Sequence, residues 1–153
     1  MREQSGRSLI EVIGVLAITA VMSAGAIGIY NSVHSTQKRT IAAAELEQVA
    51  KNVKILMEAR GTYEGVSVDY LIKAGALNRA DSPIGGEWSI TAELLSPAFS
   101  INLTELSEGD CDYFATAAPA WATHVRVNGY DYDSDQDSHC FSSHTNQISF
   151  IVE

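Results

Sequence analysis

The sequence predicts an α+β protein in which one long N-terminal helix packs on a small antiparallel sheet in a C-terminal head. Three observations lead to this prediction. No proline interrupts residues 8–60, where an uncharged apolar run is followed by an amphipathic helical pattern. Residues 61–153 instead contain short stretches that alternate apolar and polar side chains between turn residues. An Asn-Gly pair between two such stretches favours a tight hairpin.

The first half of the predicted helix is an apolar run from Val12 to Tyr30 that contains no charged residue. At about 1.5 Å per residue, its length approaches the roughly 30 Å hydrocarbon thickness of a bilayer. We therefore expect residues 7–30 to form a membrane-length helix. A short polar segment, residues 1–6, precedes it.

Glu11 stands directly before this apolar run, where a carboxylate without a partner is costly. It is therefore a candidate functional residue. A local explanation is also open, because Ser8 and Glu11 have the spacing of a capping box and the helix dipole favours an acidic first turn. A plain membrane anchor and a secretory signal peptide, with small residues at 24–26 for cleavage, are further alternatives. Neither of them gives Glu11 a role.

The second half of the predicted helix, residues 31–60, is an amphipathic stem. Its apolar residues recur at alternating spacings of four and three, which places them on one face. Gly61 is expected to end the helix. Lys38 and Arg39 are expected to be a solvated pair just outside the membrane. The expected apolar stripe consists of Ala42, Leu46, Val49, Val53 and Leu56.

The head, residues 61–153, is predicted to contain two short helices and several strands. Ser67 opens a helix that extends to about Leu77, and Ser107 caps a second helix that extends to about Ala117. Strands are expected at 88–90, at 99–104, on both sides of Asn128-Gly129 within 125–132, and at 148–152.

The charge of the chain is unevenly distributed. The net charge of −9 combines +2 over residues 1–60 with −11 over residues 61–153. An acidic head lacks the basic face that phosphate binding needs, so we expect it to bind no nucleic acid directly. The acidity is typical of an exported head that must stay soluble.

The two cysteines, Cys111 and Cys140, both lie in the head. If the apolar run directs the head out of the cytoplasm, an oxidising compartment favours their pairing. Two free buried thiols are the alternative. A bridge of this span would stabilise the fold by about 3–4 kcal/mol in the chain-entropy account.

Alternating carboxylates in the head resemble a calcium-binding loop. Gln136 and Ser142 replace the glycine and the bidentate glutamate of an EF-hand, so a solvated acidic loop is the main interpretation. Irregular Ca²⁺ binding is the weaker alternative. The carboxylates are those of Asp131, Asp133, Asp135 and Asp137.

Other chemistry has little support in the sequence. His139, Cys140 and His144 could suggest zinc, but no fourth ligand is evident. No Ser/His/Asp arrangement, phosphate loop or paired-carboxylate cleft can be identified. We therefore expect a structural protein that is not an enzyme and has no cofactor.

The N-terminus resembles that of type IV pilins and of the related type II secretion pseudopilins. The resemblance covers Gly6 to Ile18, GRSLIEVIGVLAI. In that family a prepilin peptidase cuts after the glycine and methylates the new α-amine. The resemblance implies cleavage between Gly6 and Arg7, methylation at Arg7, and pairing of Glu11 with a neighbouring subunit's N-terminal amine during assembly. Arg7 stands where the family usually has Phe or another apolar residue.

Motifs in the head extend the resemblance to type IVb pilins. Residues 83–88, PIGGEW, resemble the Gly-Gly turn of that group. Residues 99–106 followed by Cys111 resemble its strand, helix and first disulfide cysteine. The resemblance thus implies a bridge from Cys111 to Cys140 that ties this helix to the C-terminal segment.

The resemblance implies a structural subunit of a type IV pilus-like filament that serves adhesion, motility, DNA uptake or mating. The expected partners are other copies of the chain, prepilin peptidase, the inner-membrane assembly machinery and, before assembly, membrane lipid. The precursor is expected in the bacterial inner membrane and the mature subunit in an extracellular filament on the cell surface. The alternatives are a type II secretion pseudopilin and an exported or membrane-tethered binding protein.

Overall fold

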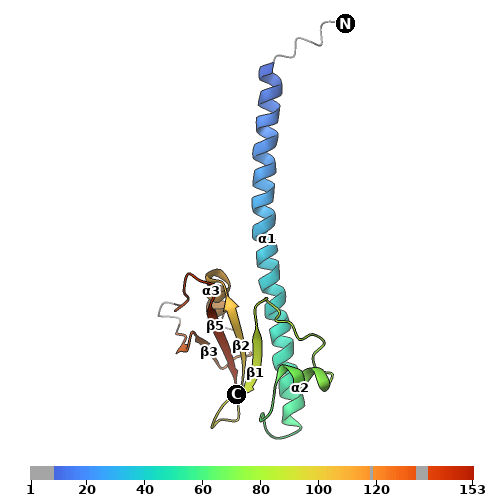
Figure 1. Cartoon of the computed structure of the whole chain (residues 1–153), viewed down its shortest axis with the longest axis vertical. Helices are drawn as coiled ribbons and strands as arrows, with labels where there is room; N and C mark the ends of the chain where they lie inside the picture. The colour runs from blue at the N-terminus through green and yellow to red at the C-terminus, as the bar shows by residue number, and fades with distance from the viewer. Residues whose placement is uncertain (1–8, 118, 134–137) are drawn as a thin grey trace. The chain divides into compact units, whose positions relative to one another are not determined.

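The structure is a computed structural model that describes residues 9–117, 119–133 and 138–153, with side chains described from His34 onward. Within these ranges three helices and five strands follow one another along the chain (Figure 1). The helices are α1 (Leu9–Glu58), α2 (Val68–Lys73) and α3 (Glu108–Ala117). The strands are β1 (Trp88–Ala92), β2 (Phe99–Leu106), β3 (His124–Val127), β4 (Tyr130–Asp131) and β5 (Asn146–Val152).

The chain divides into two units, residues 1–38 and 39–153, and every contact described below lies within the second unit. Among the residues with described side chains, no helix has an apolar stretch long enough to cross a bilayer. The predicted membrane-length helix, residues 7–30, and the segment 1–6 before it lie outside those residues. Their boundaries therefore stay predictions.

The five strands form one antiparallel sheet in the order β1-β2-β5-β3-β4. The last strand of the chain, β5, is therefore in the middle, between β2 and β3. All of its residues except Gln147 are buried. Figure 1 shows the sheet beside the C-terminal part of α1, which agrees with the α+β fold predicted from the sequence.

The C-terminal part of α1 forms one side of the hydrophobic core. The predicted stripe is buried from Ala42 to Val53. Met57 then closes this face in place of Leu56, which is only half-buried. The two positions differ by about 100° around the helix axis, and Met57 continues the four-residue step from Val53. Leu56, the last residue of the predicted stripe, therefore packs against the edge of the core, and the sequence analysis missed Met57.

Two glycines help to end the first two helices. Gly61 has φ +75 and donates its N–H to the Met57 carbonyl at 3.0 Å, so it stops α1 as predicted. Ser67 caps α2 by accepting the N–H of Tyr70 at 3.1 Å. This helix ends at Lys73 rather than near Leu77, because Gly75 takes φ +76 directly after the C-cap.

The predicted hairpin forms at Asn128-Gly129. The two residues have φ values of +50 and +87, the two positive values that a type I′ turn requires. They connect β3 to β4, which pair antiparallel with Val127 opposite Tyr130. The first strand of the hairpin, β3, starts at His124, one residue before the predicted region, and β4 ends at Asp131, one residue before the predicted end.

Candidate functional site

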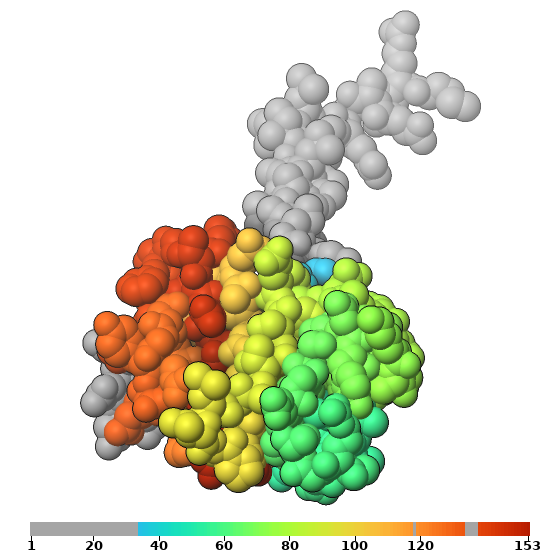
Figure 2. Space-filling model, turned by 60° about the horizontal axis from the view of Figure 1, so that its bottom comes forward, coloured from blue at the N-terminus to red at the C-terminus, as the bar shows by residue number. Residues whose placement is uncertain are grey.

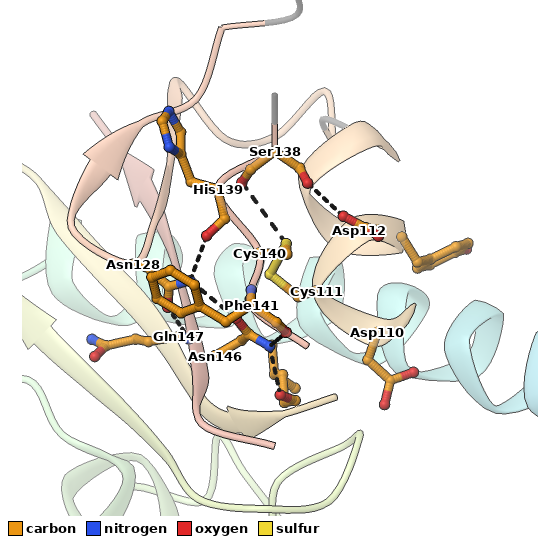
Figure 3. Close-up of a disulfide and its surroundings, with 12 residues drawn as sticks. Asp110, Cys111, Asp112, Asn128, Ser138, His139, Cys140, Phe141, Asn146 and Gln147 are labelled. Carbon is orange, nitrogen blue, oxygen red and sulfur yellow. Dashed lines mark hydrogen bonds between the residues drawn. A yellow bond between two sulfur atoms is a disulfide. The ribbon is translucent and has the colours of Figure 1, made fainter. Parts of the chain in front are cut away.

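The predicted processing and assembly residues belong to the N-terminal unit. Gly6 and Arg7 lie outside the described residues, and the side chain of Glu11 lies outside those with described side chains. The roles assigned to them therefore stay predictions. The candidate site that the structure does describe is the face of the head around the two cysteines (Figure 3).

A disulfide joins Cys111 on α3 to Cys140 in the segment before β5. The two residues are 29 positions apart in the sequence, and their Cα atoms are 6.0 Å apart. Cys111 is fully buried, whereas Cys140 packs on the edge of the core. A cysteine in a disulfide has no thiolate to offer, so this geometry excludes Cys140 as a zinc ligand. The bridge fastens α3 to the C-terminal segment, as the resemblance implied.

Asn146, the first residue of β5, organises the segment that contains Cys140. Its side chain is fully buried, and its amide group donates to the carbonyls of Leu106, Phe141 and Ser143 at 3.1, 2.9 and 2.9 Å. Its Oδ1 accepts the backbone N–H of Phe141 at 2.7 Å. A buried amide is costly unless its hydrogen bonds are made, and here both ends are used. The sequence analysis missed this residue.

Asn128 links the hairpin turn to the same segment. Its Nδ2 donates to the His139 carbonyl at 2.7 Å and to Asn146 Oδ1 at 3.0 Å. Its Oδ1 accepts the backbone N–H of Gln147 at 2.9 Å. Figure 3 shows Asn128, His139 and Asn146 converging beside the disulfide. The sequence indicates Asn128 as a turn residue but not as a tie between the turn and the disulfide segment.

Arg39 connects α1 to α3, and the prediction that it is a solvated residue was wrong. Its Nε lies 2.8 Å from Asp110 Oδ1, and its side chain is less than a third exposed. Its guanidinium also lies over the Tyr113 ring, 5.8 Å from the centroid. A Cβ on Gly109 would lie 2.9 Å from Arg39 Nη2, so the missing side chain there makes room for the arginine. Lys38 is exposed, as predicted.

Steric contact explains why the Gly-Gly turn needs a glycine at residue 86. Gly86 has φ +67, and a Cβ there would lie 2.5 Å from the carbonyl oxygen of Thr104. Because the backbone at Gly86 approaches that at Thr104 so closely, the Thr104 N–H can donate a hydrogen bond to the Glu87 carbonyl at 2.9 Å. This hydrogen bond lies at the start of the β1–β2 pairing. Trp88 follows and donates its indole N–H to the Ala80 carbonyl at 2.8 Å. The PIGGEW motif is therefore a tight turn that starts the sheet.

The structure describes only part of the weak calcium-site candidate, the aspartates at 131, 133, 135 and 137. Asp131 lies on β4 and pairs with Arg126 at 3.3 Å. Asp135 and Asp137 lie outside the described residues, so calcium binding stays a prediction. Among the residues that the structure describes, no group of three His, Cys, Asp or Glu side chains is placed to hold a metal ion.

An N-terminal helix whose C-terminal part is buried against a five-stranded antiparallel sheet is the α+β architecture of type IV pilins. The structure is similar to that of TcpA, a type IV pilin from Vibrio cholerae El Tor biotype, with a TM-score of 0.61 and 14% sequence identity. The similarity covers 76% of this chain and 99% of the TcpA chain.

The sequence is similar to the major structural subunit of the bundle-forming pilus of Escherichia coli O111:H-. The two are 24% identical over 157 residues, which cover 95% of this chain and 80% of that protein. No family model matches the chain. The resemblance to type IV pilins is nevertheless confirmed by both comparisons, which support the type IVb group. These relatives are pilus proteins rather than enzymes, in agreement with the expectation of a structural protein.

Proposed function

We propose that this chain is a structural subunit of a type IV pilus-like filament, and that the mature subunit is displayed outside the cell. The observation that carries the proposal is the similarity to a pilus subunit over 95% of the chain. The fold of the head supports it, because the part of α1 with buried residues from Ala42 to Met57 packs on a five-stranded antiparallel sheet, as in the structure of a type IV pilin.

The proposed route begins with a prepilin in the inner membrane. The peptidase cuts between Gly6 and Arg7 and methylates the new amine, and the assembly machinery moves the subunit from lipid into the filament. In the filament, the methylated N-terminal ammonium group at Arg7 of one copy would pair with the Glu11 carboxylate of a neighbouring copy. Two opposite charges among apolar helices are tolerable only as a pair, so this contact would favour the correct register of neighbouring subunits.

The first test is the intact mass and N-terminal sequence of the full-length subunit recovered from sheared surface filaments. The expected chain starts at Arg7 and carries one added methyl group. A soluble surface protein that starts at Ile27 would mean signal-peptide cleavage, and a chain that keeps Met1 would mean a tethered protein. Either result would contradict the proposal.

The second test replaces Glu11 by alanine in the producing cell. We expect Glu11→Ala to be cut and retained in the membrane but to give far fewer filaments, because the neighbour's ammonium loses its partner. Ser8→Ala is the matched control, since it removes the capping-box partner and keeps the carboxylate. If Glu11→Ala filaments form at the normal yield, the pairing mechanism is wrong.

A further inference from the structure

The hairpin turn contains a chemically labile pair of residues. Asn128 is half-buried, whereas Gly129 is exposed, and a Cβ added to the glycine would meet nothing within 4 Å. The backbone nitrogen of a glycine can attack the side-chain carbonyl carbon of a preceding asparagine, because no side chain hinders its approach. None of the other asparagines in the sequence is followed by glycine. Asn128 is therefore the asparagine of this chain that is most prone to deamidation.

Deamidation at Asn128 would consume one water molecule and no oxidant. The Gly129 nitrogen bonds to Cγ of Asn128, and the Nδ2 group takes up the proton of that nitrogen and leaves as ammonia, which gives a succinimide ring. Water then opens the ring. Attack of water at one ring carbonyl leaves an aspartate, and attack at the other leaves an isoaspartate, in which the main chain runs through the former side chain. The balance is one amide and one water to one carboxylic acid and one ammonia.

The folded head restrains the group that must leave. Nδ2 of Asn128 donates to the His139 carbonyl at 2.7 Å and to Asn146 Oδ1 at 3.0 Å, while Oδ1 accepts the Gln147 N–H at 2.9 Å. Figure 3 shows these partners around the Asn128 side chain. Because Nδ2 is the leaving group, both of its hydrogen bonds must break before the reaction is complete. The native contacts of Asn128 should therefore slow its deamidation.

One of these partners is positioned by the disulfide. His139 directly precedes Cys140, which the bridge ties to Cys111 on α3. The His139 ring also stacks on that of Tyr130 in the hairpin, with the ring centroids 4.8 Å apart. Figure 2 shows the hairpin in orange, beside the red-orange segment that contains Cys140. If the bridge opens, the His139 carbonyl can move away from Nδ2, whereas the two partners on β5 stay in the sheet.

The product of deamidation cannot make the same contacts. A carboxylate at position 128 has no N–H to donate, so its oxygen would face the His139 carbonyl and Asn146 Oδ1, which are both acceptors. Asn146 cannot turn its amide group towards the carboxylate without giving up the three backbone carbonyls to which it donates. An isoaspartate would in addition lengthen the main chain within a two-residue turn. Either product should therefore loosen the contact between the hairpin and residues 138–146.

We propose that Asn128 is a site of hydrolytic deamidation that the Cys111–Cys140 bridge controls. While the bridge is closed, the hydrogen bonds of Asn128 keep the reaction slow. Once the bridge opens, the reaction is faster, and its product releases residues 138–146 from the hairpin. Since the released ammonia does not return, a temporary opening of the bridge would leave a lasting change on the surface of the head. The inference concerns the head alone and does not depend on filament assembly.

The first experiment measures the reaction in the detergent-solubilised full-length chain, incubated with and without reductant at one mildly alkaline pH. Peptide mass spectrometry follows the conversion of Asn128 to aspartate and isoaspartate over time. Exposed Asn78, which precedes Arg79, is the internal control in the same samples. The reaction at Asn128 should be about two- to tenfold faster with reductant, the factor expected when one hydrogen bond to the leaving group is lost. The rate at Asn78 should not change.

Two outcomes of this experiment would overturn the inference. Equal rates at Asn128 with and without reductant would show that the bridge does not control the site. Amide exchange in β2, followed in the same samples, should stay slow in both. Fast exchange in β2 after reduction would mean that the bridge keeps the whole head folded rather than one segment in place, and the faster reaction would then not be a property of the site.

The second experiment tests the consequence of the reaction while the bridge is closed. Asn128→Asp places the carboxylate of the product in the turn, and Asn78→Asp adds the same charge at an exposed position. In the oxidised full-length chain, amide exchange over residues 138–146 should rise by at least about tenfold in Asn128→Asp, because acceptors then face acceptors. It should not change in Asn78→Asp. The chain deamidated in the first experiment provides the same comparison with a head that folded before the change. Slow exchange over residues 138–146 in both Asn128→Asp and the deamidated chain would overturn the inference.

Discussion

The strand β5 joins two regions of the head that are stabilised in different ways. Its residues Ile148, Phe150 and Val152 lie in the apolar core, where the ring of Phe150 contacts those of Phe114 and Trp121 at centroid distances of 6.1 and 5.2 Å. Its first residue, Asn146, is buried just as completely, but its side chain is held by hydrogen bonds to the segment beside the disulfide. We call the segment from residue 138 to residue 146 the disulfide segment.

The comparison shows that equal burial does not mean equal tolerance to change. Apolar packing has no direction, so neighbouring side chains can move to fill part of a lost volume. The disulfide segment depends on specific donors and acceptors, and removing one leaves several buried groups without partners. The two regions should therefore respond differently to substitution and to reductant.

The largest effect is expected in the apolar region. Phe150→Ala should lower the free energy of unfolding by about 3–5 kcal/mol, through lost burial and the cavity that remains. Urea unfolding of the detergent-solubilised full-length subunit, followed by tryptophan fluorescence, measures this value. The loss should be the same with and without reductant. A loss that disappears under reducing conditions would mean that the two regions are not separate.

The second-largest loss of stability is expected when the disulfide is removed. Cys140→Ser should lower the free energy of unfolding by about 3–4 kcal/mol, because the unfolded chain gains the freedom that the bridge removes. Backbone amide exchange should rise in the disulfide segment and stay slow in β2. Reductant should produce the same change in the unsubstituted chain and none in the variant. Identical unfolding curves with and without reductant would indicate that the bridge does not support the fold.

Asn146→Ala should lower the free energy of unfolding by about 1–3 kcal/mol, since it removes the donor to the buried Leu106 carbonyl and to the partly buried Phe141 carbonyl. Gln147→Ala is the matched control one residue further along, and its exposed side chain predicts little change. Because Asn146 and Cys140 hold the same segment, their two substitutions should be non-additive by at least about 0.5 kcal/mol. Strict additivity in a double-mutant cycle would refute the idea that they act together.

The smallest effect is expected at Arg39, whose contacts are partly exposed. Arg39→Ala should cost about 1 kcal/mol or less, and the loss should shrink further at high salt. Lys38→Ala, at the exposed neighbouring position, should change nothing measurable. A loss of several kcal/mol would mean that the link from α1 to α3 belongs with the core rather than with the surface.

Sequence patterns correctly predicted the turns and helix caps that depend on interactions between residues close together in the sequence. The two positive φ values at Asn128-Gly129 and the cap at Ser107, whose Oγ accepts the N–H of Asp110 at 3.2 Å, follow from residues adjacent in the sequence. The choice of Met57 over Leu56 does not, because both positions fit a helical stripe and the surface of the head decides between them.

The side-chain ties between distant elements could not be predicted in this way. Arg39 and Asp110 are 71 residues apart, and no spacing rule relates them. Leu106, the most distant partner of Asn146 in the sequence among the residues described here, becomes its neighbour only when the β2–β5 register places the two residues opposite each other. The predictions at Gly6, Arg7 and Glu11 are of another kind, since they concern processing and contacts between copies and depend on the resemblance alone.

The contact between Arg39 and Gly109 also has a consequence for the evolution of the chain. A Cβ at position 109 would meet only the end of the Arg39 side chain, which is flexible and can move aside. An alanine at position 109 would therefore displace the guanidinium from Asp110 and Tyr113 rather than disturb the backbone of α3. A lineage could thus lose the α1–α3 link by a substitution at position 109 while keeping the arginine itself.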